Sequence, residues 1–312
     1  MVQISKKKRS LLQRLALDWN RYKSLYLFFA LPLLVYYIVF RYIPLYGLQI
    51  AFRDFKITKG MWDSPFVGFE HFRTFFNGLY FFRLIRNTLT ISLYDLLFGF
   101  PAPIVFALLL NEVTNAPFKK IVQTITYLPH FVSTVVICGL IVQFCSKDGL
   151  INQIIMAFGG EAKDLLMSSR YFRTIYIASG IWSGFGWGSI VYLSALAGVD
   201  QEQYEAAFID GANRFQRMAY ITLPGIAPTI IILFIMKIGG LMSVGSEKIL
   251  LLYNGLTYEV SDVISTYVYR MGLIEHNYSF STAIGLFNSL INIMLLLLAN
   301  YLSRRYSETS LW

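Results

Sequence analysis

Apolar side chains occur along this chain in long runs separated by shorter polar stretches. A helix needs about 20 consecutive, mostly apolar residues to cross the hydrocarbon core of a bilayer. The chain therefore predicts an all-α integral membrane protein with six membrane-spanning helices, at Leu25–Tyr46, Thr88–Leu110, Ile121–Phe144, Thr174–Leu196, Pro224–Val244 and Ser281–Leu302.

Prolines lie inside several of these runs, and we expect the helices to kink there, at Pro32, Pro101, Pro103 and Pro129. Membrane helices tolerate proline when neighbouring groups satisfy the freed backbone carbonyls. The connections are not expected to cross the membrane. We expect Phe52–Arg86 to lie along the outer interface, Asp148–Arg170 to hold a short apolar piece at Leu150–Phe158, and Gly245–Tyr278 to link the last two spans outside.

Composition supports a membrane protein, because only 14% of the residues are charged and the mean hydropathy is +0.53. Soluble domains carry about 25% charged residues. The net charge is +9, and seven of the 27 basic residues precede Leu25: Lys6, Lys7, Lys8, Arg9, Arg14, Arg21 and Lys23.

This basic cluster has two readings, a nucleic-acid patch or a cytoplasmic anchor beside a first span. The apolar run that begins at Leu25 favours the anchor and argues against nucleic acid as a partner. A cleaved signal peptide is a further alternative, but the run is long and no small-x-small cleavage site follows it. We expect a cytoplasmic segment over residues 1–24, a membrane domain over 25–305 and a cytoplasmic tail over 306–312.

The loop over residues 198–224 is predicted to form a helix, a turn and a second helix on the cytoplasmic side. Glu205-Ala206-Ala207 favours helix. Gly211 suits the positive φ of a helix C-terminal cap, and Asn213 suits the start of a second helix. Pro224 is expected to begin the next span, since proline is favoured in the first turn of a helix.

The same loop has the features of a docking surface. Small residues allow another surface to approach closely, two phenylalanines offer apolar anchors, and four charges can pair with a partner: Ala206, Ala207, Gly211, Ala212, Phe208, Phe215, Glu205, Asp210, Arg214 and Arg217. An ordinary solvated loop is the alternative. Connections of this length are usually functional, which favours docking.

The pattern Glu-Ala-Ala, three residues, Gly, nine residues, Ile-x-Leu-Pro resembles the signature loop of ABC importer permeases. It is carried here without a gap by Glu205, Ala206, Ala207, Gly211, Ile221, Leu223 and Pro224. The resemblance implies the type I ABC importer permease fold. It also implies that the loop forms a coupling helix in a cleft of an ATPase subunit, with Glu205 facing a basic residue of that subunit and Gly211 at the turn.

Other segments resemble permeases for oligosaccharides, namely Val67–Phe72 and Asn87-Thr88. The stretch Asp262–Arg270 is similar to the branch that handles fragments of complex polysaccharides. Together these likenesses cover most of residues 20–305.

The resemblance implies a multi-pass subunit of the bacterial cytoplasmic membrane that imports an oligosaccharide by alternating access. Expected partners are a second homologous permease, two ATPase subunits, an extracytoplasmic solute-binding protein and membrane lipid. The chain has no Gly-x-x-x-x-Gly-Lys-Ser/Thr loop, so we expect it to be a non-catalytic subunit without a cofactor, ATP and Mg²⁺ being bound by the ATPase subunits.

Polar and aromatic residues within the spans are candidates for contact with cargo, because polar groups in a membrane are costly and often functional. Trp182 and Trp187 stand among glycines, where backbones come close or cargo passes. Lys237 lines the pathway, pairs with Asp95, or has a packing or snorkelling role. Asn288 and Asn292 share one helix face and bind either hydroxyl groups or a neighbouring helix; Gln143 and Glu247 are weaker candidates.

Other functional classes find little support. Cys138 and Cys145 have no metal-ligand spacing, and the three histidines stand in separate segments, so neither a metal site nor a catalytic group is predicted. A secondary transporter or channel that works without an ATPase remains the main alternative. A structural membrane scaffold would have no use for the signature loop.

Overall fold

The computed structural model describes Trp19, residues 21–307 and residues 309–312, and every regular element in those residues is a helix. This confirms the all-α class. Two isolated antiparallel bridges, Arg53 with Phe66 and Lys56 with Gly60, shape the connection after the first helix. Most of the basic N-terminal cluster, Lys6 to Arg14, lies outside the described residues.

The helices follow one another in this order: η1 (Tyr26–Ala30), α2 (Leu31–Tyr37), η2 (Ile38–Tyr42), α3 (Ile43–Leu45), η3 (Tyr46–Phe52), α4 (Glu70–Phe76), α5 (Phe81–Tyr94), η4 (Asp95–Gly99), α6 (Pro101–Asn111), α7 (Ala116–Tyr127), η5 (Leu128–Phe131), α8 (Thr134–Cys145), α9 (Leu150–Ala157), η6 (Leu165–Met167), α10 (Ser169–Leu196), α11 (Gln201–Ile209), α12 (Arg214–Arg217), η7 (Met218–Thr222), α13 (Leu223–Gly239), α14 (Ser246–Leu252), α15 (Tyr258–Ser261), α16 (Ile264–Tyr269), η8 (Arg270–Ile274) and α17 (Tyr278–Tyr306).

Among the described residues, five continuous stretches are long and apolar enough to cross a bilayer: Arg21–Phe52, Phe81–Asn111, Thr134–Ala157, Arg214–Gly239 and Tyr278–Tyr306. They contain the first, second and sixth predicted spans and most of the fifth. The fourth predicted span lies in the 28-residue helix α10. Its glycines, serines and aromatic hydroxyls dilute the apolar residues, so α10 is not among the five, and the number of six spans stays a prediction.

The third predicted span, Ile121–Phe144, is wrong as a single helix. Helix α7 ends at Tyr127, a 3-10 turn follows over Leu128–Phe131, and Val132 and Ser133 are extended. The side chain of Ser133 accepts a hydrogen bond from the backbone N–H of Val136 and caps α8. Hydropathy could not show this break, because the residues around Pro129 are as apolar as those of a helix. The stretch long enough to cross is Thr134–Ala157, which also includes α9.

The expected start of the fifth span at Pro224 is also wrong. The helix begins at Arg214 and runs through α12, η7 and α13 to Gly239, five residues short of the predicted end. The second helix of the loop over residues 198–224 is therefore the first part of the span itself. This continuity means that a displacement of the loop acts directly on α13.

Four of the prolines inside the long helices closely follow π-helical turns. Such a turn ends two residues before each of Pro32, Pro44, Pro101 and Pro224. A proline ring clashes with the carbonyl one turn earlier and cannot donate a hydrogen bond. The wider i→i+5 turn makes room for the ring, so the helices continue past these prolines.

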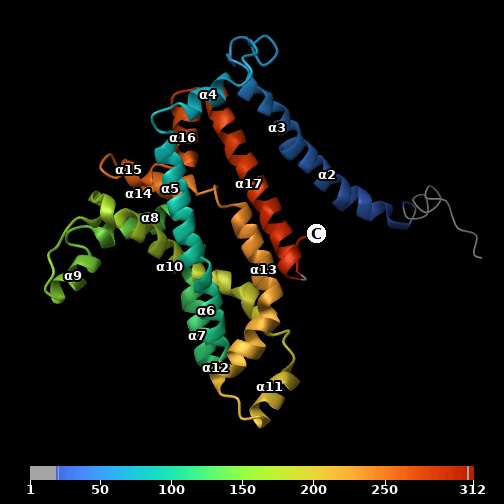
Figure 1. Ribbon diagram of the computed structural model, residues 1–312, viewed down its shortest axis with the longest axis vertical. Coiled ribbons are helices and arrows are strands. Elements are labelled where there is room, and N and C mark those ends of the chain that lie inside the picture. The colour runs from blue at the N-terminus through green and yellow to red at the C-terminus, as the bar shows by residue number, and fades with distance from the viewer. Residues whose placement is uncertain (1–18, 20, 308) are drawn as a thin grey trace, which may run out of the picture.

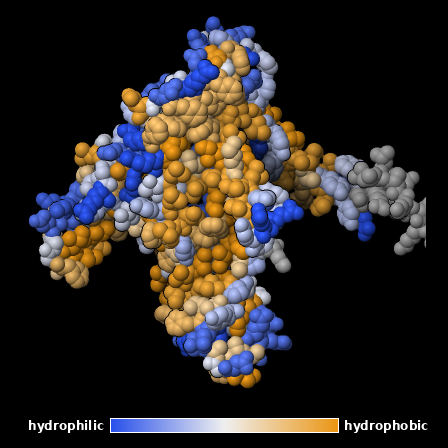
Figure 2. Space-filling model, in the orientation of Figure 1, coloured by the Kyte–Doolittle hydropathy of each residue, from blue (hydrophilic) through white to orange (hydrophobic). Residues whose placement is uncertain are grey.

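The main body is held by contacts among α6, α10, α13 and α17, with α4 and η3 covering one end of α17. Apolar cores fill the spaces between them, including one that joins α8, α10 and α14 around Ile141, Phe172 and Ile249. The helix Arg21–Phe52 diverges from this body (Figure 1), and none of its most apolar 18-residue window is buried in the chain. Figure 2 shows apolar side chains covering the middle of the visible face.

Candidate functional site

The cytoplasmic loop predicted from the signature pattern has well-defined local geometry. Asp200 caps α11 by accepting the backbone N–H of Glu202 at 3.0 Å. At the other end, the N–H of Ala212 bonds to the carbonyl of Ala207 at 2.9 Å and that of Gly211 to Phe208 at 3.1 Å. This is a Schellman motif, which requires a left-handed residue after the helix. Gly211 has φ +79°, as predicted.

The second part of the loop begins at Asn213, which also confirms the prediction. Its side chain accepts the backbone N–H of Gln216 at 3.0 Å, and the Gln216 side chain accepts the N–H of Asn213 at 2.8 Å. This reciprocal capping box satisfies two donors that the helix cannot pair. The turn between α11 and α12 is therefore set by hydrogen bonds at both ends.

Side-chain contacts join α11 to the span that follows. The hydroxyl of Tyr204 lies 3.0 Å from Oγ1 of the buried Thr222. Val199, just before α11, packs so closely on Gly225 that a Cβ there would lie 2.8 Å from it. Because Thr222 and Gly225 belong to the helix that continues into α13, α11 cannot shift without straining that helix.

The loop lies at the lower end of the molecule (Figure 1), and it exposes apolar side chains there. Phe208 is 71% exposed and Phe215 77% exposed. A hollow of about 410 Å³ is lined by Tyr204, Glu205, Phe208, Ile209 and Arg217. Of the other predicted docking residues, Ala207 is half-buried and the rest are exposed: Ala206, Asp210, Gly211 and Arg214.

Within the part of the chain that the structure describes, the loop charges Glu205, Asp210, Arg214 and Arg217 form no ion pair. Charged groups next to exposed phenylalanines suit a partner that supplies opposite charges and apolar pockets.

A second group of predicted residues lies between the two ends of the molecule. Lys237 on α13 forms an ion pair with Asp95 on η4, as one of the sequence-based alternatives proposed. Both side chains line a cavity of about 310 Å³ between α5, α10, α13 and the start of α14. The structure thus shows the predicted pairing of Lys237 with Asp95, and a role of Lys237 in the cargo pathway stays a prediction.

Sequence reasoning missed Lys248, which lines the same cavity. It lies on α14, in the connection between α13 and α17, and its Nζ donates to the backbone carbonyl of Tyr176 at 2.7 Å. The ammonium group also stands over the Tyr176 ring, 4.6 Å from the centroid. Burial lowers the pKa of Lys248 to about 8, because desolvation disfavours the charged form.

The two asparagines of α17 differ in their surroundings. Asn292 accepts the backbone N–H of Met242 at 2.9 Å and donates to Ser243 Oγ at 2.8 Å, so both ends of its amide hold the segment after α13. Asn288 has a buried Oδ1 without a hydrogen-bond partner in the described residues. Asn292 therefore hydrogen-bonds to a neighbouring segment of the chain, as one alternative proposed. The side-chain oxygen of Asn288 remains free to accept a hydrogen bond within the described residues.

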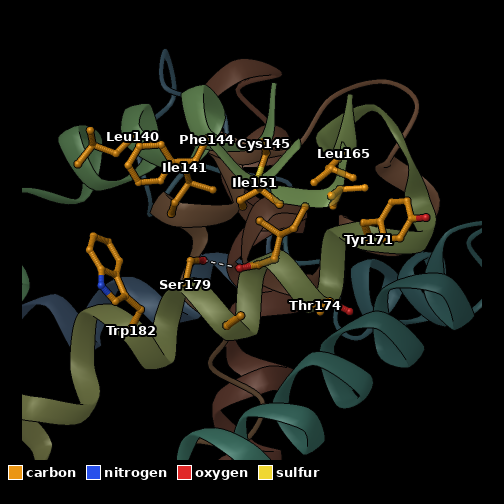
Figure 3. A pocket seen from close by; sticks show the side chains of 13 residues that line it. Leu140, Ile141, Phe144, Cys145, Ile151, Leu165, Tyr171, Thr174, Ser179 and Trp182 are labelled. Atoms are coloured by element: carbon orange, nitrogen blue, oxygen red, sulfur yellow. Dashed lines mark hydrogen bonds between the residues drawn. The ribbon is translucent and has the colours of Figure 1, made fainter. Parts of the chain in front are cut away.

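The two tryptophans of α10 are both about two-fifths exposed. Trp187 stacks on His130, with ring centroids 4.6 Å apart and planes 6° from parallel. Trp182 lies at one end of an apolar pocket of about 550 Å³, with Tyr171 at the other end and side chains of α8 opposite (Figure 3). Neither tryptophan lines the charged cavity.

Several segments noted separately in the sequence meet at α5. The carboxylate of Asp262 is fully buried and pairs with Arg270 at 2.7 Å and Arg83 at 3.3 Å. Asn87 donates to the backbone carbonyl of Asp262 at 2.9 Å, and Thr88 accepts the N–H of Ile264 at 3.1 Å. The sequence did show polar residues in apolar surroundings at Asn87-Thr88 and at Asp262. It did not show that these two segments contact each other.

Comparison with known proteins assigns the chain to a family. Residues 99–308 match the model of the binding-protein-dependent transport system inner membrane component. The chain belongs to this family. The matched range contains α6 to α17, and with them the loop over residues 198–224. It also contains most residues that line the charged cavity, whereas Ile91, Ser92 and Asp95 precede it.

Relatives of this permease extend the match over nearly the whole chain. Protein LplB of Bacillus subtilis (strain 168) is 47% identical over 94% of this chain and 92% of its own length. The polygalacturonan/rhamnogalacturonan transport system permease protein YteP of the same organism is 42% identical over 96% of this chain and 94% of its own.

Solved structures agree with the fold of this permease. A chain of a bacterial ABC transporter involved in the import of the acidic polysaccharide alginate matches with a TM-score of 0.86 and 44% identity, covering 94% of this chain and 99% of that one. A chain of a bacterial alginate ABC transporter in complex with an alginate pentasaccharide-bound periplasmic protein matches with a TM-score of 0.87 and 42% identity, covering 97% and 100%.

Proposed function

We propose that this chain is the membrane-spanning permease subunit of an ATP-driven ABC importer that translocates an oligosaccharide. Family membership and the match to a chain from an alginate importer support this. The name of the relative YteP, a permease for polygalacturonan and rhamnogalacturonan, supports an oligosaccharide as cargo. The complex with a periplasmic protein supports delivery by an extracytoplasmic binding protein.

The observation that carries the proposal is the surface formed by α11 and the turn after it. Its exposed Phe208 and Phe215 are the apolar anchors, and Glu205 is the ionic contact to a basic residue of the ATPase. The Schellman motif at Gly211 and the contact from Tyr204 to Thr222 make the loop rigid. A movement of the ATPase would thus be passed to α13 as a push, because α12 and α13 are one helix.

The expected assembly contains a second homologous permease, two ATPase subunits that bind ATP and Mg²⁺, and the binding protein, all at a bacterial cytoplasmic membrane. Both termini and the docking loop face the cytoplasm in this arrangement. Alternating access then moves the cargo past the cavity at Lys237. Trp182 and Asn288 remain candidates for cargo contact, whereas Trp187 and Asn292 are engaged within the chain.

The test is co-purification and uptake with Glu205→Lys. Reversing this exposed charge should repel the basic residue of the ATPase, so we expect at least about tenfold weaker retention of the ATPase, the size of one lost charge-assisted contact, and loss of ATP-driven uptake. Gly211→Asp should act similarly, since a side chain is strained at φ +79°.

Gln203→Lys is the matched control. It adds the same lysine to the same helix, two residues away and on the opposite face from Glu205. It should leave retention and uptake unchanged while all variants insert in the membrane. Uptake at the wild-type rate in the absence of any ATPase would contradict the proposal and favour a secondary transporter or channel.

A further inference from the structure

We propose that the cavity at Lys248 binds a carboxylate-bearing sugar ring of the cargo, with the Lys248 ammonium as the group that engages the carboxylate. This inference rests on the proposed function and names the substrate class, an oligosaccharide that contains uronic acid. It assigns to Lys248, and not to Lys237, the contact with cargo charge.

The charges that line the cavity do not balance. Two lysines and one carboxylate line it, and the carboxylate of Asp95 is paired with Lys237. Lys248 forms no ion pair in the described residues. An ammonium group has three donors, of which the carbonyl of Tyr176 takes one. Lys248 therefore has both an uncompensated charge and free donors for an anion.

The position of this cation argues against a merely structural lysine. α14 lies between the docking loop at one end of the molecule and α4 at the other (Figure 1). A charged group that loses contact with water is costly unless it is paired or hydrogen-bonded, so a partly buried ammonium group calls for an anionic partner. The single carbonyl and the aromatic face that contact Lys248 stabilise the ammonium, but neither carries a negative charge.

The size and outline of the cavity suit one ring of a longer chain. Its volume of about 310 Å³ is at the lower end of ligand pockets, which span about 300–1,000 Å³. Two glycines keep it open: Gly245 has no other atom near its missing side chain, and a Cβ on Gly180 would lie 3.3 Å from Lys248 Nζ. Ser243 also lines the cavity and can donate its hydroxyl proton to a sugar oxygen, since its oxygen already accepts from Asn292.

The experiment measures binding to the purified importer complex, without the binding protein, of tetragalacturonate and of the same tetrasaccharide with its carboxyl groups reduced to alcohols. We expect wild type to bind the acid more tightly than the reduced sugar. Lys248→Met should weaken binding of the acid at least about tenfold, the effect of removing one partner of a buried charge pair, and leave the reduced sugar unchanged. Lys248→Arg should retain most of the preference for the acid over the reduced sugar, because it keeps a positive charge at this position.

Lys163→Met is the matched control, because Lys163 is exposed, does not line the cavity, and forms only a surface pair with Glu161. Gly180→Val is a second variant that keeps Lys248 but fills the space beside it, and it should weaken binding of both sugars. The inference is overturned if wild type prefers neither sugar, or if Lys248→Met binds both as wild type does or loses both equally.

ATP-driven uptake in proteoliposomes, measured in parallel with the binding protein added, separates the two proposals. If uptake depends on ATP but Lys248→Met does not change the preference for the acidic sugar over the reduced one, only this inference is overturned. Uptake that needs no ATPase would overturn the proposed function whatever the result with Lys248→Met.

Discussion

At the scale of single residues, burial decides how much a charge contributes. Asp262 has no exposed surface and is the shared partner of Arg83 and Arg270, with Thr266 Oγ1 donating a further hydrogen bond at 2.8 Å. Asp54 pairs with Lys56 at 3.4 Å on the surface, where both side chains are about half exposed. Buried pairs are costly to break and exposed pairs contribute little, so these two aspartates should respond differently to the same substitution.

Asp262→Ala should destabilise the protein by about 3–5 kcal/mol, because it leaves two largely buried guanidinium groups without their carboxylate. Asp54→Ala should cost at most about 1 kcal/mol. Unfolding of the detergent-purified protein, followed by circular dichroism with increasing denaturant, compares the two. Equal losses of stability would contradict this ranking and show that the buried ion pairs of Asp262 contribute no more to the free energy of unfolding than the exposed pair of Asp54.

At the scale of elements, α10 owes its close packing to two of its glycines. A Cβ on Gly186 would overlap the backbone carbonyl of Thr126 on α7, and one on Gly188 would lie 3.2 Å from Pro103 on α6. A Cβ on Gly184 would meet no other atom within 4 Å. Small residues allow membrane helices to approach this closely. The sequence-based alternative of close backbones thus holds for Gly186, whereas Gly188 packs against a proline side chain and Gly184 has no neighbouring atom.

Gly186→Ala should force α10 away from α7 and cost about 1–3 kcal/mol, the usual range for overpacking a filled site. Gly184→Ala adds the same methyl group two residues earlier and should change stability little. The temperature at which each purified variant unfolds measures the difference. A Gly186→Ala variant as stable as Gly184→Ala would mean that α7 and α10 are not in close contact.

At the scale of the whole molecule, polar contacts connect parts of the chain that are remote in sequence. Asp95 and Lys237 are 142 residues apart and join η4 to α13 beside the charged cavity. Their side chains are each about two-fifths exposed in the isolated chain. The pair lines the cavity between the packed helices. Each charge is therefore stabilised there by the opposite charge of its partner.

Asp95→Ala and Lys237→Ala should each destabilise the protein, and the double variant should lose less than the sum of the two. Each single variant leaves one member of the pair without its partner, whereas the double variant removes both members. We expect a coupling energy of about 0.5–3 kcal/mol from a double-mutant cycle on unfolding. Losses that add within about 0.5 kcal/mol would show that the two groups do not act as a pair.

Local chemistry made much of this protein predictable from its sequence alone. Long apolar runs identified most of the membrane helices. Unpaired backbone N–H and C=O groups are costly in lipid, so an apolar segment that crosses the membrane forms a helix that pairs them internally. Gly211 and Asn213 could be assigned their roles for the same reason: a Schellman motif and a capping box depend only on residues within one or two turns. The break at Leu128–Phe131 was missed since an apolar run does not reveal where a helix ends.

Only the tertiary structure decided which polar groups meet. Lys248 and Tyr176 are 72 residues apart, and Asn292 and Met242 are 50 apart. Hydropathy and helix propensity act over a few turns of one segment, whereas these contacts depend on how α10, α13, α14 and α17 pack. The turn and caps of the loop over residues 198–224 could therefore be predicted from the sequence. The charged cavity could not, because its lysines acquire their surroundings only when the helices come together.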